Sequence, residues 1–199
     1  IGDGEELIDE SLEGVDCAAG IVRDIREFSH EGTEVLEMVD LNELLDQTLR
    51  VARLQIPRGA HIDKRLGDLP LVSCQPQRIR QVLMNLILNA AQAIESDGCI
   101  SLITQRAGDE VVIWIEDDGC GIPDEFIDRI FDPFFTTKFT GRGLGLAAVL
   151  GIMRVTAAAF TSSVEPPTST TSLISDAFFL ASSSARRTGP IVRSTMGLI

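Results

Sequence analysis

The sequence predicts an α+β fold in the form of a two-layer α/β sandwich, and two observations support this prediction. From residue 35 onward, segments with helical spacing of apolar residues alternate with short apolar segments typical of strands. Hydrophobic residues make up 44% and charged residues 24% of the 199 residues, a composition typical of a packed core. We therefore expect one sizeable domain with additional segments.

A long helix is expected before the sandwich, at residues 5–31. Its apolar residues recur at steps of three and four: Ile8, Leu12, Val15, Ala19, Val22 and Ile25. Such a stripe suits a partner helix in a coiled coil or bundle, and it suits an ordinary core-facing helix nearly as well.

The first half of the sandwich is predicted to contain three strands and a helix. The strands are expected at Val35–Val39, His61–Leu66 and Leu71–Cys74, with a Gly-Asp-Leu-Pro turn between the last two. The helix begins at Asp40, and Glu43 stands at the spacing of a capping box.

The second half is predicted to contain two helices and a hairpin. The first helix runs from Gln77 to Glu95, and the hairpin joins buried strands at Ile100–Gln105 and Val111–Glu116. An apolar helix follows at Leu144–Met153.

Charge and cysteine usage exclude several classes of function. A formal net charge of -13 argues against a nucleic-acid surface, which needs clustered Lys and Arg. The four cysteines are scattered without a CxxC pair, so we expect neither a zinc site nor a disulfide framework, and a cytoplasmic location follows.

No apolar run is long enough to span a membrane, so no membrane contact is expected. Because the chain begins with Ile1, we expect a fragment of a longer protein.

Asn85 and Asn89 lie four residues apart on the helix at 77–95 and therefore share one face. An Asn amide oxygen can fill one corner of a Mg²⁺ shell whose other corners hold phosphate oxygens and water. In the alternative interpretation, one of the two amides only forms hydrogen bonds within the core.

Asp117 and Asp118 follow an apolar strand and precede Gly119 and Gly121. A carboxylate at the end of a strand can accept the exocyclic amine of adenine, and the glycines let the backbone approach the base. An acidic turn without any ligand has the same pattern, so this segment alone leaves both interpretations open.

Gly141, Gly143 and Gly145 open the final helix, and amide groups at a helix N-terminus can bind phosphate. A dinucleotide fingerprint would need glycine in place of Leu146, and no Walker sequence is present. A phosphate site of a third class is therefore required.

The segment FDPFFTTK at 131–138 connects the two glycine-rich regions. Its aromatic residues can anchor a mobile lid that carries Lys138 and Arg142 over the phosphates. In the alternative interpretation, it is an apolar loop packed on the domain with a solvated Lys138.

In this order, NLILNA, DDGCGIP, FDPFFTTK and GRGLGL resemble the asparagine box, first glycine motif, phenylalanine box and second glycine motif of bacterial sensor histidine kinases. The resemblance runs from about Val39 to Arg154. These kinases belong to a larger group that also contains gyrase, heat-shock chaperone ATPases and mismatch-repair ATPases. It implies an ATP-binding domain of the histidine-kinase type, with ATP and Mg²⁺ as cofactors.

The resemblance also implies a role for each matching residue. Asn89 would bind Mg²⁺, Asn85 would lie on its phosphate side, and Asp117 would recognise adenine. The other residues implied in cofactor binding are Gly119, Gly121, Phe131, Lys138, Gly141, Arg142, Gly143, Leu144 and Gly145. Asn85 and Lys138 are the two residues assigned to catalysis.

One position favours phosphoryl transfer over hydrolysis. In the related ATPases a Glu that activates water stands one turn before the metal-binding Asn, whereas this chain has Asn85, which cannot act as a general base. We expect transfer of the γ-phosphoryl group of ATP to a histidine. The acceptor motif of the family is missing, and neither His30 nor His61 is assigned to it. A nucleotide-binding module without activity and a gyrase-type ATPase therefore stay as alternatives.

The resemblance divides the chain into three parts. Residues 1–34 resemble the second helix of a dimerisation hairpin, which implies a homodimer and a response regulator receiver domain as partner. Residues 35–154 form the ATP-binding domain. From Val155 the Ser- and Thr-rich sequence departs from the family, although its codons, read one nucleotide earlier, can spell the expected Gly-His-Gly-Gly. We hypothesise a frameshift in 155–199, which predicts poor order, lost strands and an exposed sheet edge.

Overall fold

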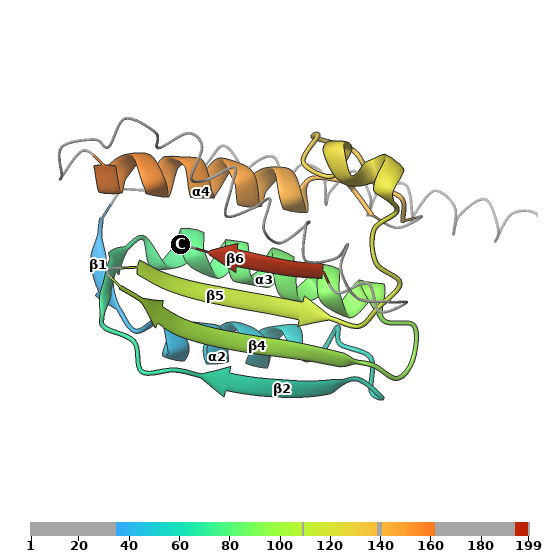
Figure 1. The fold of residues 1–199 in the computed structure, drawn as a ribbon, viewed down its shortest axis with the longest axis horizontal. Helices are drawn as coiled ribbons and strands as arrows, with labels where there is room; N and C mark the ends of the chain where they lie inside the picture. Colours follow the sequence, from blue (N-terminus) through green and yellow to red (C-terminus); the bar gives the residue numbers. More distant parts are fainter. Residues whose placement is uncertain (1–34, 109, 139–140, 162–193, 199) are drawn as a thin grey trace, which may run out of the picture.

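A computed structural model describes residues 35–108, 110–138, 141–161 and 194–198, with side chains described up to Arg154 (Figure 1). The helix expected at residues 5–31 lies outside the described residues. Within the described part, helices and strands combine into the α+β sandwich that the sequence predicts.

A four-stranded sheet forms one layer, with strand order β2-β4-β5-β6. Its strands are β2 (His61–Leu66), β4 (Cys99–Ala107), β5 (Glu110–Asp117) and β6 (Ser194–Leu198). β2 and β4 are parallel, whereas β4–β5 and β5–β6 are antiparallel. The β4–β5 hairpin confirms the prediction for this region, and its register pairs Ile100 with Asp117 at the end that carries the first glycine motif.

The second layer contains three helices. α2 (Leu41–Ala52) and α3 (Pro76–Ala93) lie against the sheet, and α4 (Gly145–Thr161) packs on α3 (Figure 1). A short 3₁₀ helix, η1 (Asp124–Arg129), lies between β5 and α4 and was not predicted. The core joins the apolar faces of α2 and α3 to β4 and β5, with fully buried residues such as Leu45, Leu83, Ile87, Ile100, Leu102 and Ile113.

Strands are found near both predicted segments, His61–Leu66 and Leu71–Cys74. They do not pair with each other across the turn, because they belong to different sheets. β3 (Val72–Cys74) pairs antiparallel with β1 (Glu37–Val39) in a separate two-stranded sheet. The backbone N–H of Gly67 donates to the carbonyl oxygen of Thr104 at 2.9 Å. Since this bond prolongs the β2–β4 ladder past Leu66, the chain stays on β4 and does not turn back.

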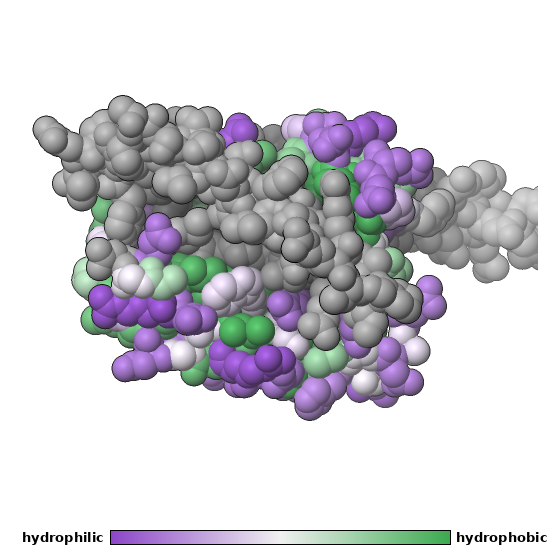
Figure 2. Space-filling view, viewed as in Figure 1, coloured by the Kyte–Doolittle hydropathy of each residue, from purple (hydrophilic) through white to green (hydrophobic). Residues whose placement is uncertain are grey.

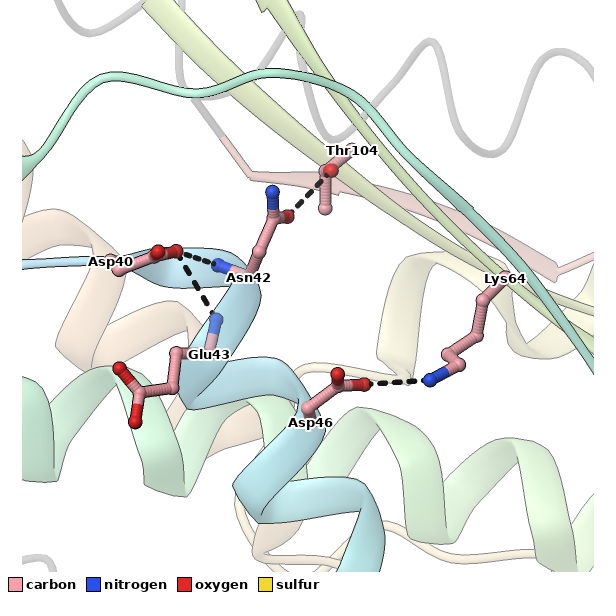
Figure 3. Close-up of polar contacts among 6 residues, drawn as sticks. All are labelled: Asp40, Asn42, Glu43, Asp46, Lys64 and Thr104. Carbon is pink, nitrogen blue, oxygen red and sulfur yellow. Dashed lines mark hydrogen bonds and ion pairs between the residues drawn. The ribbon is translucent and has the colours of Figure 1, made fainter.

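The N-terminus of α2 is fixed by its cap, as Figure 3 shows. The Asp40 carboxylate accepts hydrogen bonds from the backbone N–H groups of Asn42 at 2.9 Å and Glu43 at 3.2 Å. This confirms the predicted helix start. The reciprocal half of the capping box is not found, because the Glu43 carboxylate accepts instead from Gln47 at 3.0 Å, one turn further along the helix.

The expected loss of all strands after β5 is not found, because β6 follows β5 and forms this edge of the sheet. β6 pairs with β5 from Ile113 to Asp117, since the backbone groups of an unpaired strand accept any strand within reach. α4 also continues beyond Arg154 to Thr161. β2 forms the opposite edge and includes the exposed Lys64 and Arg65. Hydrophilic residues are abundant along the lower side of Figure 2, where β2 lies.

The cysteines Cys74, Cys99 and Cys120 are free thiols. Within the part of the chain that the structure describes, no helix has both the length and the apolar character needed to cross a membrane.

Candidate nucleotide site

The two asparagines of α3 have different environments. The Asn85 side-chain amide donates to the carbonyl oxygen of Gly145 at 3.3 Å and so ties the middle of α3 to the first residue of α4. Asn89, one turn later, is half-buried, and its side chain has no hydrogen bond with any residue of the described ranges. Asn85 thus uses its NH2 group to hold α4, whereas the Asn89 amide uses neither its NH2 group nor its oxygen within those ranges and keeps both available for a ligand.

The two aspartates at the end of β5 also separate. Asp118 is exposed, and its carboxylate accepts from the backbone N–H of Cys99 at 2.7 Å, which fastens the start of β4. Asp117 is only 4% exposed, and its carboxylate accepts from the N–H of Gly119 at 3.1 Å. Asp117 is thus the buried carboxylate at this end of the sheet, whereas Asp118 holds the hairpin.

Burial dominates the electrostatics of Asp117. Loss of solvent raises the pKa of this carboxyl to about 6, and the neighbouring Asp118 acts in the same direction. The Gly119 N–H and the Lys138 ammonium oppose that rise. A buried carboxylate with this pKa gains from an additional hydrogen-bond donor, such as the exocyclic amine of a purine.

The first glycine motif packs on the end of α3. The backbone N–H of Cys120 donates to the carbonyl oxygen of Ala93 at 2.9 Å. A Cβ on Gly119 would overlap that carbonyl group, and Gly121 has a φ of +70°. The chain can therefore pass close to α3 here only with glycine.

The second glycine motif packs on the phenylalanine segment. Gly143 has a φ of +67°, its carbonyl oxygen accepts from the N–H of Phe134 at 2.8 Å, and a Cβ there would overlap the backbone of Phe134 and Phe135. Phe134 itself has a φ of 68° and is 63% exposed. A non-glycine residue in this conformation carries strain of about 1 kcal/mol or more, which is common at ligand-binding sites.

Of the three aromatic residues expected to anchor the segment at 131–138, Phe135 makes the ring contacts with η1. Its ring lies 5.6 Å from the ring of Phe126, and the Arg129 guanidinium lies 4.4 Å from the Phe135 ring centroid. Phe131 is half-buried. The two contacts of Phe135 attach the middle of the phenylalanine segment to η1.

Lys138 reaches across to the last turn of α3. Its ammonium nitrogen lies 3.4 Å from the carbonyl oxygen of Asn89 and 3.2 Å from Oε1 of Gln92. Burial lowers the pKa of Lys138, while Cys120 and Asp117 oppose the shift. The structure thus brings Lys138 to Asn89 and within electrostatic reach of Asp117.

The remaining predicted residues lie around the start of α4. Gly141 donates its backbone N–H to the carbonyl oxygen of Lys138 at 3.1 Å. Arg142 is exposed and Leu144 is half-buried, and the Leu144 carbonyl oxygen accepts from the N–H of Ala148 at 2.9 Å. α4 begins at Gly145, so the glycine motif directly precedes a helix N-terminus, as predicted.

Sequence reasoning missed two participants, Gln92 and Ala93. Gln92 stands three residues after Asn89 and seven after Asn85, so its helical position is the signal that could have identified it. The Ala93 contact arises from its backbone carbonyl, for which the sequence carries no signal.

Residues 74–175, about half of the chain, match the family described as "Histidine kinase-, DNA gyrase B-, and HSP90-like ATPase". The chain is 36% identical over 155 residues to the sensor histidine kinase ZraS of Escherichia coli, an alignment that covers 76% of this chain and 33% of that protein. It is also 36% identical over 147 residues to the signal transduction histidine-protein kinase AtoS of Escherichia coli, covering 72% of this chain and 24% of that protein. The chain therefore spans about a third or less of the length of these relatives.

Solved structures of histidine kinases have the same fold. Full-length ShkA in complex with AMPPNP superposes with a TM-score of 0.62 at 28% identity, covering 71% of this chain and 32% of that chain. The histidine kinase ThkA in complex with the response regulator protein TrrA superposes with a TM-score of 0.58 at 28% identity, covering 76% and 43%.

Proposed function

Because the chain belongs to the histidine kinase-, DNA gyrase B- and HSP90-like ATPase family and contains its ATP-binding domain, we propose that it transfers the γ-phosphoryl group of ATP to a protein histidine. The observation that carries this proposal is the convergence of three groups. Asp117 is buried at the end of β5, the Asn89 amide has no hydrogen bond within the described ranges, and Lys138 lies near both.

Asp117 would recognise the adenine base. Its carboxylate accepts from the Gly119 N–H and is almost fully shielded from water, so an amine donor of the base would add to the stabilisation of the buried charge. Gly119 and Gly121 would bring the backbone close to the base, because Gly119 lets the chain pack on Ala93 and Gly121 has a φ of +70°.

The phosphates would bind at the start of α4. The peptide N–H groups of residues 141–145 precede the helix N-terminus, where anions are stabilised. The side chains of Lys138 and Arg142 would add positive charge, with Leu144 and Phe131 in apolar contact with the nucleotide.

Mg²⁺ fits this set of residues. Among the described residues, no group of three or more His, Cys, Asp or Glu side chains is placed to hold a metal ion, so these residues form no closed cage. Mg²⁺ usually keeps several waters and binds through one or two protein oxygens plus substrate phosphates, and the Asn89 amide oxygen is available for that role. Bound there, Mg²⁺ would neutralise phosphate charge.

Transfer is favoured over hydrolysis by the state of Asn85. Its amide donates to Gly145, and an amide does not remove a proton from water at neutral pH. The protein would act chiefly by positioning, which suits attack by a histidine brought from another helix.

The partners that we propose follow from the relatives. A solved kinase with the same fold is complexed with a response regulator, which supports a receiver domain as partner of this chain. We further propose that the protein acts in the cytoplasm and forms a homodimer through residues 5–31, a segment outside the described ranges.

A nucleotide-binding module without transfer activity is the second candidate, and the position of the histidines favours it. His61 lies in β2, at the edge of the sheet, where its backbone N–H donates to the carbonyl oxygen of Gly98 at 2.7 Å. It is not on a helix, and His30 lies outside the described residues, so the described residues contain no helical histidine as a phosphate acceptor.

Adding an acceptor separates the two candidates. Mg-ATP binding is measured by calorimetry, and phosphate transfer is followed with labelled ATP and an added histidine-containing hairpin from a relative. Transfer that disappears in Asp117→Asn and with a hairpin lacking its histidine would support the kinase. Binding without transfer would favour the module, and absence of binding would contradict both.

A further inference from the structure

Gln92 contacts Lys138 beside the proposed nucleotide site. Its side-chain oxygen accepts from the Lys138 ammonium at 3.2 Å, and the Asn89 carbonyl oxygen accepts from the same ammonium at 3.4 Å. The two acceptors are three residues apart on the last turn of α3. A lysine ammonium has three donors, so two of them are directed to one helix end.

This end of α3 is a favourable place for a cation. Carbonyl groups at a helix C-terminus carry partial negative charge, and the helix ends at Ala93 without a basic residue in its last turn. Asp117 adds a carboxylate within electrostatic reach of Lys138. Lys138 therefore supplies, from a different segment, the positive charge that α3 itself lacks.

The same location is also the one in which we propose that Mg²⁺ binds. Lys138 contacts the backbone of Asn89, and the side chain of that residue is the proposed metal ligand. Two cations this close repel each other, particularly where burial reduces solvent screening. The Lys138 ammonium, where it contacts Asn89 and Gln92, would thus compete with Mg²⁺ for the negative potential at the C-terminal turn of α3.

We infer that Gln92 is a positioning residue, which holds Lys138 on the C-terminal turn of α3 and opposes its transfer to the nucleotide phosphates. This inference rests on the proposed function. Gln92 is neutral and exposed, so it forms a weak and reversible attachment. Nucleotide binding would exchange the Gln92 and Asn89 acceptors of Lys138 for phosphate oxygens.

Substitution of Gln92 tests the competition. We expect Gln92→Ala to bind a Mg-bound nonhydrolysable ATP analogue about three- to tenfold more tightly, because one hydrogen bond to the ammonium no longer has to break. Gln92→Glu should bind it more weakly by a similar factor, since an ion pair would hold Lys138. Gln77→Ala, an exposed glutamine near the start of the same helix, is the matched control and should leave the affinity unchanged.

A measurement without nucleotide tests the attachment itself. Lys64 and Lys138 are the two lysines of the sequence, so NMR of lysine-labelled protein gives two side-chain signals, with Lys64 as internal reference. We expect Gln92→Ala to increase the motion of the Lys138 side chain and to leave Lys64 unchanged. The affinity gain should also vanish when Lys138→Ala is already present, because coupled residues are not additive.

The outcomes separate the two levels of the proposal. Unchanged Lys138 motion in Gln92→Ala would overturn the attachment. Increased motion with an unchanged or lower affinity would overturn the competition and leave nucleotide binding intact. Absence of nucleotide binding in every variant, with Lys138 still released, would overturn the proposed function and the competition with it.

Discussion

Two regions of this molecule combine asparagine with nearby carboxylates, and they differ in how completely the polar groups are paired. In the first region, Asn42 on α2 accepts from the buried Thr104 hydroxyl at 2.8 Å, as Figure 3 shows. Asn42 also donates to the Gly67 carbonyl oxygen at 2.8 Å. Near the end of β5, the Asn89 side chain has no partner among the described residues, and Asp117 is buried with a raised pKa. The polar groups of the first region are paired within the protein, and we propose that a bound nucleotide pairs with those of the second.

This difference teaches which polar groups are structural. The hydrogen bonds among Asn42, Gly67 and Thr104 join α2 to the sheet. Each donor in this group has an acceptor within the protein. Buried polar groups without full pairing cost stability, and proteins retain them chiefly where function requires them. Substitutions should therefore affect stability in the first region and ligand affinity in the second.

The largest effect is expected for Asp117→Asn. Loss of the carboxylate should weaken ATP binding by roughly tenfold to a hundredfold, because a charge-assisted hydrogen bond to adenine is lost. Calorimetric titration measures this directly, with circular dichroism as the control for folding. An ATP affinity equal to that of the wild type would contradict the role of Asp117.

The same variant should be more stable than the wild type at high pH. The folded pKa of about 6 lies above the unfolded value of 3.8, so the ionised carboxylate destabilises the folded state above pH 6. In urea unfolding without nucleotide, we expect Asp117→Asn to gain about 2 kcal/mol at pH 8. The gain should decrease as the pH falls through 6 and vanish near pH 4. A difference independent of pH would contradict the burial of this charge.

A matched pair of asparagine variants sharpens the comparison. Asn42→Ala should lower the free energy of unfolding by about 2 kcal/mol, since Gly67 and Thr104 each lose a partner, and should leave the nucleotide site unchanged. Asn89→Ala should do the opposite, with a change in stability below about 0.5 kcal/mol and ATP affinity reduced about tenfold in the presence of Mg²⁺ only. Equal loss of affinity with and without Mg²⁺ would assign Asn89 a structural role.

Smaller losses of stability are expected for Asp40 and Lys64, which lie near Asn42 in Figure 3. Asp40→Ala should cost about 1 kcal/mol through loss of the α2 cap, and Asp40→Asn should be nearly neutral because asparagine caps equally well. Lys64→Ala should cost less than about 0.5 kcal/mol, since its ion pair with Asp46 at 3.0 Å lies on the surface. Chemical unfolding of the three variants tests this order, and a larger loss at Lys64 than at Asp40 would reverse it.

Local signals predicted most of the helices and the hairpin. The Asp40 cap, the apolar faces of α2 and α3, and the β4–β5 hairpin depend on neighbours in the sequence, so their patterns are visible there. Strand partners were harder to predict, because β2 pairs with β4 across α3, and β3 pairs with β1. Sequence spacing contains no direct record of such distant pairings.

The site was predictable as a set of motifs but not as a geometry. Only the fold distinguishes Asp117, which is buried, from Asp118, which holds the backbone of Cys99. The contact between Lys138 and Gln92 joins residues 46 positions apart, so no local pattern indicates it.

A structure of the chain crystallised with Mg²⁺ and a nonhydrolysable ATP analogue tests the central claim most directly. We expect the adenine amine within about 3 Å of the Asp117 carboxylate and the metal at roughly 2.1 Å from the Asn89 amide oxygen. A nucleotide bound away from these two side chains, or bound with neither in contact, would contradict the assignment of this region as the ATP site.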